Sequence, residues 1–213
     1  MSCTQCRGIA SFFDAKVAAR ELRKYRKRGP HKTTQMLIDA VRAEAGEAES
    51  LLDIGGGIGA VQHALIGEGV LAQGLDVDAS PAYLETAREE AERRGYAEKV
   101  RYVPGNFVDV AGEIPAVDVV TLDRVICCFD DMEQLVTRSS EKAKRIYGLV
   151  FPRVTPFTRL GFRVLNAFLR FRRSAFRVFL HPPEAVDALV RARGFSLRAH
   201  RRSLLWQVRL YTR

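Results

Sequence analysis

From residue 49 onward, short apolar runs alternate with longer segments in which apolar residues recur every three or four positions. The short runs predict strands, and the longer segments predict helices between them. The strands are expected at 51–54, 70–77, 100–103, 117–122 and 146–151. Strands that alternate with helices in this way form a parallel sheet covered on both faces. The pattern therefore predicts an α/β domain with an open parallel sheet.

Helical periodicity also marks the N-terminal part. One helix with a very basic face is expected over 9–28, where Gly29-Pro30 breaks it. Thr33 or Thr34 can cap a second helix that ends near residue 46. The helices of the alternating part are expected over about ten residues after the first strand, and over 82–94, 130–144 and 182–193.

The C-terminal part departs from the alternation. Only Arg202 and Ser203 separate the apolar runs 195–201 and 204–211, so these runs are expected to pair as a hairpin. An extra amphipathic segment covers 155–172, ahead of the last helix. Its apolar members include Phe157, Leu160, Val164, Leu165, Phe168 and Phe171, and its basic members include Arg159, Arg163, Arg170, Arg172 and Arg173.

Length and composition limit the class of protein. The 213 residues suit one domain with a small extension, and 47% hydrophobic residues are enough for a core, which excludes global disorder. No apolar run approaches the roughly 20 residues that span a bilayer, and the N-terminus has no apolar signal segment. Four cysteines are too few for a disulfide scaffold. These features predict a cytoplasmic protein without a transmembrane segment.

The net charge of +9 is unevenly distributed along the chain. Residues 1–32 carry 9 basic and 2 acidic side chains, residues 33–143 carry 9 and 21, and residues 144–213 carry 16 and 2. Solvated faces and ion pairs between the segments explain such a pattern. An anionic substrate, a nucleic acid or a membrane surface explains it as well.

A glycine-rich turn follows the first strand of the alternating part and opens a helix. Its sequence is Asp53-Ile54-Gly55-Gly56-Gly57-Ile58-Gly59. Glycines let the backbone turn sharply and approach a ligand closely, and Gly55, Gly57 and Ala60 also fit a loose dinucleotide fingerprint. A pyrophosphate is disfavoured because Asp53 places a carboxylate beside the turn. That carboxylate can instead accept a hydrogen bond from the cationic amine of S-adenosylmethionine (SAM), which has no phosphate.

A second acidic position lies at the end of the next strand. Asp78 comes 25 residues after Asp53, where an acid can bind both hydroxyls of a ribose. Asp76 points to the same face and is the alternative. Asp78 is preferred because it directly precedes Ala79 in the loop.

Polar and aromatic side chains also follow the third and fourth strands. The amide of Asn106 can pair with the edge of an adenine, and Phe107 can pack on its ring. Asp123 stands at the end of the fourth strand. These positions extend the predicted ligand site along the carboxyl ends of the strands.

In this order and spacing, the motifs resemble those of the class I SAM-dependent methyltransferase family, over about residues 33–213. The resemblance rests on 52–59, on 75–81 with the following Leu84 and Ala87-Arg88, and on 105–107. Asn106 stands where the family usually has Asp. The family implies a Rossmann-like, seven-stranded, mostly parallel sheet with an antiparallel last strand, and SAM as cofactor with S-adenosylhomocysteine as product. The expected cofactor-binding residues are Thr34, Asp53, Gly55, Gly57, Gly59, Asp78, Ala79, Asn106, Phe107 and Asp123. An ordinary α/β domain that binds a different nucleotide is the alternative.

The region after the fourth strand bears on the methyl acceptor. Family members that methylate base amino groups often carry Asn/Asp-Pro-Pro-Tyr there, whereas this chain has Asp123-Arg124-Val125-Ile126-Cys127-Cys128-Phe129. This run and 176–181 look distantly like small-molecule O-methyltransferases such as the magnesium-protoporphyrin methyltransferase group. We therefore predict transfer to a small, anionic or apolar-ring acceptor at oxygen. An RNA methyltransferase with basic terminal segments and a non-catalytic SAM-fold binding protein are the alternatives.

Three residues are candidates for work on the acceptor. His181 can act as a base or orient the acceptor, or it can be a structural histidine beside a helix. Arg124 can bind a substrate carboxylate, or pair with Asp123 or Asp130. Tyr25 lies near the end of the N-terminal helix. Residues 1–46 are predicted to form a helical lid on a methyltransferase domain at 47–213, whose insertion 155–173 is the other candidate lid.

The cysteines occur in two pairs, Cys3 with Cys6 and Cys127 with Cys128. They make a four-thiolate metal site only if the N-terminus folds over the end of the fourth strand. Because the side chains of adjacent cysteines diverge, we predict plain thiols and no metal, and redox or thiol-substrate chemistry is the remaining alternative. The oligomeric state is not predicted.

Overall fold

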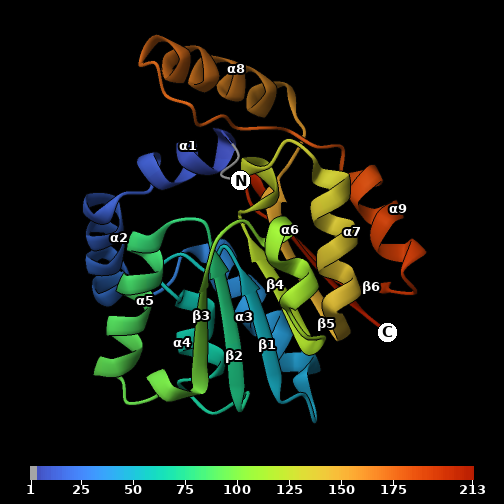
Figure 1. The fold of residues 1–213 in the computed structure, drawn as a ribbon. Helices are drawn as coiled ribbons and strands as arrows, with labels where there is room; N and C mark the ends of the chain where they lie inside the picture. The colour runs from blue at the N-terminus through green and yellow to red at the C-terminus, as the bar shows by residue number, and fades with distance from the viewer. Residues whose placement is uncertain (1–3) are drawn as a thin grey trace.

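The computed structural model describes residues 4–213, with side chains from Gly8 onward, and contains a seven-stranded sheet between two layers of helices (Figure 1). The strand order is β3-β2-β1-β4-β5-β7-β6. The strands are β1 (Ser50–Ile54), β2 (Gln73–Asp78), β3 (Val100–Pro104), β4 (Val117–Asp123), β5 (Ala143–Pro152), β6 (Ser196–Arg202) and β7 (Trp206–Thr212). β7 pairs antiparallel with both β5 and β6, and the other pairings are parallel. The predicted Rossmann-like sheet and its C-terminal hairpin are confirmed.

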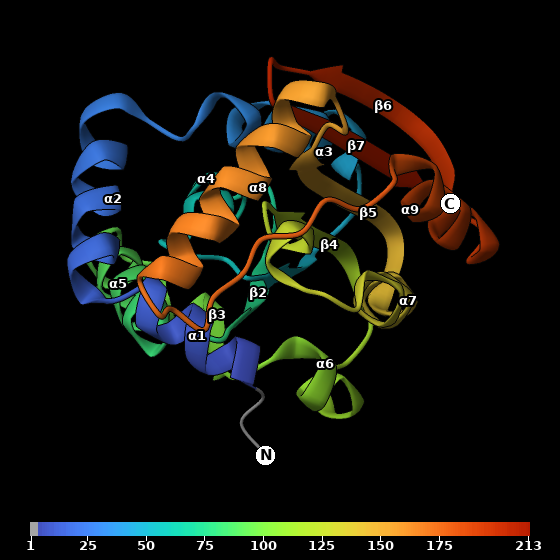
Figure 2. The ribbon, with the colours of Figure 1, turned by 90° about the horizontal axis from the view of Figure 1, so that it is seen from above.

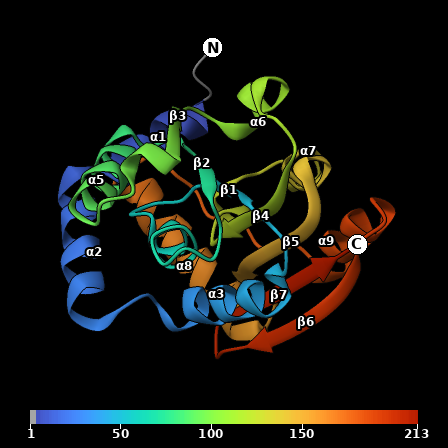
Figure 3. The same cartoon turned by 90° about the horizontal axis from the view of Figure 1, so that it is seen from below.

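Helices cover both faces of the sheet, as Figure 3 shows from below. The core on one face is formed with α6 (Phe107–Val110), α7 (Met132–Lys142) and α9 (Pro183–Ala192). The core on the other face is formed with α3 (Lys32–Ala45), α4 (Ala60–Leu65) and α5 (Pro81–Arg93). Short 3-10 turns are η1 (Ala97–Lys99), η2 (Ala111–Glu113) and η3 (Ile126–Cys128).

Three further helices lie outside these layers. They are α1 (Thr4–Phe12), α2 (Ala15–Arg28) and α8 (Pro156–Phe171). Viewed from the side and from above, α1 and α8 lie beyond one edge of the sheet (Figures 1 and 2). This is the edge at which the parallel strands end, because the ends of β1, β2 and β4 share a cavity with α1 and α8.

The prediction of one helix over 9–28 is wrong. The chain breaks between α1 and α2, where Asp14 caps α2 by accepting a hydrogen bond from the Val17 N–H. Neither Thr33 nor Thr34 caps α3, because the His31 ring accepts from the Thr33 N–H instead. No signal in the sequence marked α6, in which the Asn106 side chain accepts a hydrogen bond from the Val108 N–H.

A buried carboxylate fixes α2 on the surface of α5. Glu90 is fully buried and accepts hydrogen bonds from Arg26 of α2 and from Arg93 and Arg94. The hydrogen bonds from these guanidinium groups, that from Arg93 above all, hold its pKa well below the usual range. α2 is therefore tied to α5 near its C-terminal end, which helps to position its cavity-lining residue Glu21.

Candidate active site

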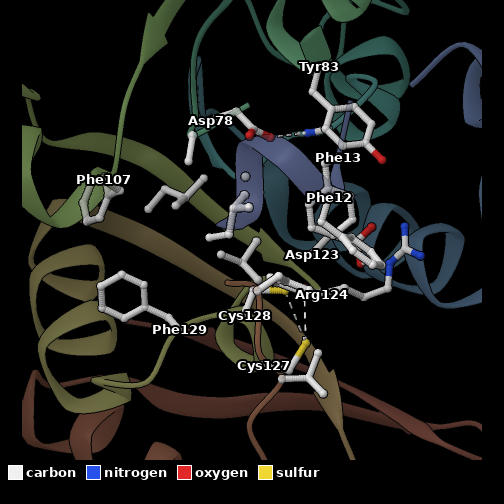
Figure 4. A pocket seen from close by; sticks show the side chains of 18 of the residues that line it. Phe12, Phe13, Asp78, Tyr83, Phe107, Asp123, Arg124, Cys127, Cys128 and Phe129 are labelled. Carbon is white, nitrogen blue, oxygen red and sulfur yellow. Dashed lines mark hydrogen bonds and ion pairs between the residues drawn. The ribbon is translucent and has the colours of Figure 1, made fainter. Parts of the chain in front are cut away.

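The candidate active site is a cavity of about 370 Å³ at the carboxyl edge of the sheet (Figure 4). Its volume lies within the range of small-molecule sites. One part is lined by Gly55, Gly57, Asp78, Ala79, Asn106 and Phe107. The other part is lined by Phe12, Phe13, Phe162, Leu165, Phe176 and Val178. The strand ends thus supply the polar residues of the lining, beside apolar ones such as Ile54 and Val77, and α1, α8 and the segment after α8 supply an apolar part.

The glycine turn brings backbone to the wall of the cavity. Gly55, Gly57 and Gly59 all have positive φ angles, of 64°, 59° and 78°. At Gly55 a Cβ atom would lie 2.6 Å from a methyl group of Val125, which also lines the cavity. Gly55 and Gly57 line the cavity, whereas Gly59 begins α4 above the ring of His63.

Asp78 is held rigidly where β2 meets this turn. Its carboxylate accepts hydrogen bonds from the Gly57 N–H at 3.1 Å and from the Ser80 N–H at 2.7 Å. Burial raises the pKa of Asp78 to about 6, although both N–H groups favour its charged form. The side chain still reaches the cavity, so two backbone donors orient a carboxylate toward any ligand there.

We expect the affinity for SAM to depend on the protonation of Asp78. Because its pKa is raised to about 6, a proton competes with ligand hydroxyl groups for the carboxylate as the pH falls. Affinity should therefore drop by up to about tenfold between about pH 7 and about pH 5. Calorimetric titration across this range measures the effect. Asp78→Asn should remove the pH dependence, and an equal slope in that variant would contradict the assignment.

Asp53 and Asp76 lie beneath the cavity rather than in its wall. Both are fully buried, and neither is a lining residue. Asp53 accepts a hydrogen bond from the Thr121 hydroxyl at 2.7 Å, and Asp76 accepts one from the Gln62 amide at 2.6 Å. Burial raises the pKa of both carboxyl groups, and the other acidic side chains nearby add to the effect. Asp76 and Asp78 were the two alternatives for binding the ribose at the end of β2, and of these only Asp78 faces the cavity.

Asn106 and Phe107 lie side by side at the start of α6 and line the cavity. The Asn106 side-chain oxygen accepts a hydrogen bond from the Val108 N–H at 3.2 Å. Capping therefore occupies the amide oxygen and leaves the amide NH₂ group as the donor that can face a ligand. Phe107 presents an almost fully buried ring to the same space.

Asp123, Thr34 and Arg124 meet at the end of β4. The Thr34 hydroxyl donates to the Asp123 carboxylate at 2.5 Å, and Arg124 Nε lies 3.4 Å from the other oxygen. Asp123 and Arg124 line the cavity, whereas the buried Thr34 supports Asp123 from behind. Burial opposes ionisation of Arg124, but the carboxylates of Asp123 and Glu21 outweigh it and raise the pKa of the guanidinium. Arg124 is therefore a fixed positive charge at the cavity, on a backbone with a φ angle of 64°.

His181 and Tyr25 are not lining residues. A ring nitrogen of His181 is hydrogen-bonded to the carbonyl of Phe129, a lining residue, at 2.8 Å. The Tyr25 ring packs against His63 at 5.5 Å and lies beneath the guanidinium of Arg94. These contacts do not bring either side chain to the place where an acceptor can enter.

Phe12 at the end of α1 and Phe13 just after it line the cavity, and no signal in the sequence marked them. Phe12 stacks on Phe176 at 4.6 Å, and Phe13 packs against Phe176 and Tyr83. Figure 4 shows Phe12, Phe13 and Tyr83 across the cavity from Phe107. The Tyr83 hydroxyl donates to Glu21, a lining residue of α2.

This packing requires a glycine in α1. A Cβ at Gly8 would lie 2.5 Å from the backbone nitrogen of Phe176, so only glycine allows this close approach. In a single sequence no signal links Gly8 to a partner far along the chain.

The two cysteines after β4 also line the cavity. The Cys127 thiol donates to the carbonyl of Arg124 at 3.4 Å and lies 3.9 Å from the Cys128 sulfur. The hydrogen bond with the Cys128 thiol, together with burial, raises the pKa of Cys127. Cys3 and the side chain of Cys6 lie outside the described residues, so the four-thiolate alternative is not tested. Among the described residues, no group of three or more His, Cys, Asp or Glu side chains is arranged for a metal ion.

Comparisons with known proteins agree with this fold. Residues 52–145 match the family model of a methyltransferase domain. One similar solved structure is magnesium protoporphyrin IX methyltransferase (ChlM) from Synechocystis PCC 6803 with bound S-adenosylhomocysteine. Its sequence is 17% identical to this chain, and the two structures superpose with a TM-score of 0.73 over 98% of this chain and 99% of that one. An O-methyltransferase family protein from Burkholderia thailandensis is 18% identical with a TM-score of 0.66, covering 84% of this chain. The chain spans only 56% of the length of that relative. No curated protein sequence matches significantly.

The sheet order and the glycine turn define a Rossmann-like methyltransferase fold. Residues 52–145 thus match a methyltransferase domain, and the chain has the class I SAM-dependent methyltransferase fold that its motifs predicted. Within the described residues, no helix is long and apolar enough to cross a membrane.

Proposed function

We propose that the protein transfers the methyl group of SAM to a small-molecule acceptor, at an oxygen nucleophile. The observation that carries the proposal is the division of the cavity into a polar part at the strand ends and an apolar part under α1 and α8. Bound SAM supplies an electrophilic methyl group, and the enzyme has to align a nucleophile with it. A cavity with two such parts suits a polar cofactor beside an apolar acceptor.

In this proposal, each cofactor-binding residue acts through an atom that faces the cavity. Asp78 accepts hydrogen bonds from the two ribose hydroxyls, while Gly55 and Gly57 allow close approach of the backbone. Asn106 donates its amide NH₂ to the adenine edge, and Phe107 packs on the adenine ring. These roles agree with the positions of the residues in the cavity wall.

The cationic amine of SAM is assigned to a different carboxylate from the one predicted. Asp53 is fully buried and engaged by Thr121, so it supports the turn from below. Asp123 is a lining residue whose one oxygen accepts from Thr34, while its other oxygen, 3.4 Å from Arg124 Nε, is the one that can accept from the amine. Asp123 therefore faces the positively charged end of the cofactor, and Thr34 acts as its positioning residue.

On the acceptor side, Arg124 supplies positive charge and the aromatic residues supply an apolar surface. We propose that α1 with the first half of α2, and α8 in the insertion 155–173, act as two lids over the acceptor. Their aromatic contacts exclude water from the apolar part. An aromatic or other apolar acceptor that bears an anionic group fits this combination.

The test is formation of S-adenosylhomocysteine with a panel of aromatic hydroxy and carboxylic acids and their neutral analogues. We expect turnover with acidic acceptors, and Arg124→Gln should raise their KM about tenfold because a charge-assisted hydrogen bond is lost. The same change should leave the KM of neutral analogues unaltered. Arg101→Gln, an exposed arginine outside the cavity, is the matched control.

Two outcomes would contradict the proposal. Turnover of RNA, with binding that weakens steeply as salt rises, would favour the RNA methyltransferase. Binding of SAM without turnover across acceptor classes would favour a non-catalytic binding protein.

A further inference from the structure

We propose that α8 docks on the surface of a membrane that contains anionic lipids. The helix is the outermost element of the molecule at the carboxyl edge of the sheet (Figures 1 and 2). Its side chains form three separate stripes along its length, one packed on the domain, one apolar and exposed, and one basic. The three stripes determine how the helix is oriented and what it can contact.

The inner stripe fixes the rotation of α8 on the domain. It consists of Thr158, Phe162, Asn166 and Leu169, spaced three or four residues apart. The Asn166 side chain exchanges two hydrogen bonds with the backbone of Val178, and Leu169 is buried against the segment that follows the helix. The other faces of α8 are thereby held toward the outside.

The apolar stripe faces away from this packing. Its members are Phe157, Leu160, Val164, Phe168 and Phe171, again spaced three or four residues apart. Phe157 and Phe171 are 83% and 84% exposed, and the other three are more than half exposed. Large apolar side chains gathered on one exposed face mark an interaction surface. Leu204 is a further exposed apolar side chain, in the turn whose carbonyls accept hydrogen bonds from Arg153, two residues before the Thr155 cap of α8.

The basic stripe runs alongside the apolar one. Arg159, Arg163 and Arg170 are exposed, and none of them has an ion pair with another described residue. No acidic residue occurs between Glu141 and Glu184 in the sequence. Arginines beside an apolar stripe place their charges at lipid headgroups while the apolar side chains enter the acyl boundary.

The positive charge of α8 indicates which kind of partner binds this surface. Two copies that met through α8 would bring these arginines close together without compensating carboxylates from the same segment, which is unfavourable. An anionic lipid surface complements both stripes at once. The described helices include none that spans a bilayer, so α8 lies on the surface rather than crossing it.

The test is co-sedimentation of the full chain with vesicles. Vesicles of phosphatidylcholine with about one quarter phosphatidylglycerol should bind the protein, because each basic residue near an anionic surface adds about fivefold in affinity. Pure phosphatidylcholine should bind it much more weakly. Arg159→Gln with Arg163→Gln should weaken binding about 25-fold on that basis, and Phe157→Ser with Phe171→Ser should weaken it at least about tenfold.

The matched control is Arg23→Gln with Lys27→Gln, which removes the same charge from exposed positions of α2. This variant should keep its vesicle binding to within about threefold. All variants change exposed side chains, and a thermal melt confirms that they fold.

Three results would overturn the proposal. They are no difference between the two vesicle compositions, equal losses in the α2 control, and a dimer in solution that the Phe157 and Phe171 changes dissociate. None of these measurements depends on methyl transfer, so the docking proposal and the proposed function can fail separately.

Discussion

Replacement of Asp78 by alanine is expected to weaken the binding of SAM by at least about a hundredfold, because two hydrogen bonds to a charged acceptor contribute about 3 kcal/mol or more. The variant also loses the acceptor for the N–H groups of Gly57 and Ser80, so the glycine turn becomes less ordered. Isothermal titration calorimetry with SAM measures the change directly.

Two companion variants separate recognition of the ribose from support of the turn. Asp78→Asn keeps an oxygen that accepts from Gly57 but removes the charge. Asp109→Ala removes one exposed carboxylate near the site without touching the cavity. We expect an intermediate loss of affinity for the first and no change for the second. Unchanged affinity in Asp78→Ala would show that the ribose binds elsewhere.

The Gly55→Ala variant is expected to lose about 3 kcal/mol of folding stability through a strained backbone and a steric clash. Gly55 has a φ angle of 64°, and the added Cβ would lie 2.6 Å from Cγ2 of Val125. Since both residues line the cavity, the shift that relieves the clash should also weaken SAM binding. Chemical denaturation and calorimetry measure the two effects.

Combining Gly55→Ala with a second substitution, Val125→Ala, separates the two causes of the lost folding stability. It removes the methyl group that the new Cβ meets, so the clash disappears and the strain of the positive φ remains. Gly55→Ala should therefore cost less in that background than in the wild type. Gly112→Ala is the control, because a Cβ there meets nothing within 4 Å. A Gly55→Ala protein as stable as the wild type would contradict the geometry of the turn.

The sheet was predictable because the sequence signal for each strand lies within the strand itself or in the residues next to it. Apolar runs gave all seven strands to within a few residues, and the two-residue spacer at Arg202-Ser203 gave the hairpin. The glycine turn and Asp78 were predictable as a site for a similar reason, since chain order in an α/β fold places the ends of neighbouring strands at one edge.

The acceptor side was not predictable because it depends on contacts between distant segments. Nothing local shows that Gly8 meets Phe176, or that Phe12 and Phe13 line the cavity. The sequence pattern also could not distinguish a lining carboxylate from a supporting one, so Asp53 was assigned to the ligand although it lies beneath the turn. The break between α1 and α2 was missed because the Asp14 cap outweighs the helical periodicity on both sides.

The central claim is that SAM binds with its ribose on Asp78 and its methyl group toward the apolar part of the cavity. A crystal structure of the full chain with S-adenosylhomocysteine tests it most directly. We predict that both ribose hydroxyls lie within hydrogen-bond distance of the Asp78 carboxylate, that the adenine contacts Asn106 and Phe107, and that the sulfur faces Phe12 and Phe13. A ligand whose ribose does not contact Asp78, or whose sulfur points away from the aromatic part of the cavity, would contradict the claim.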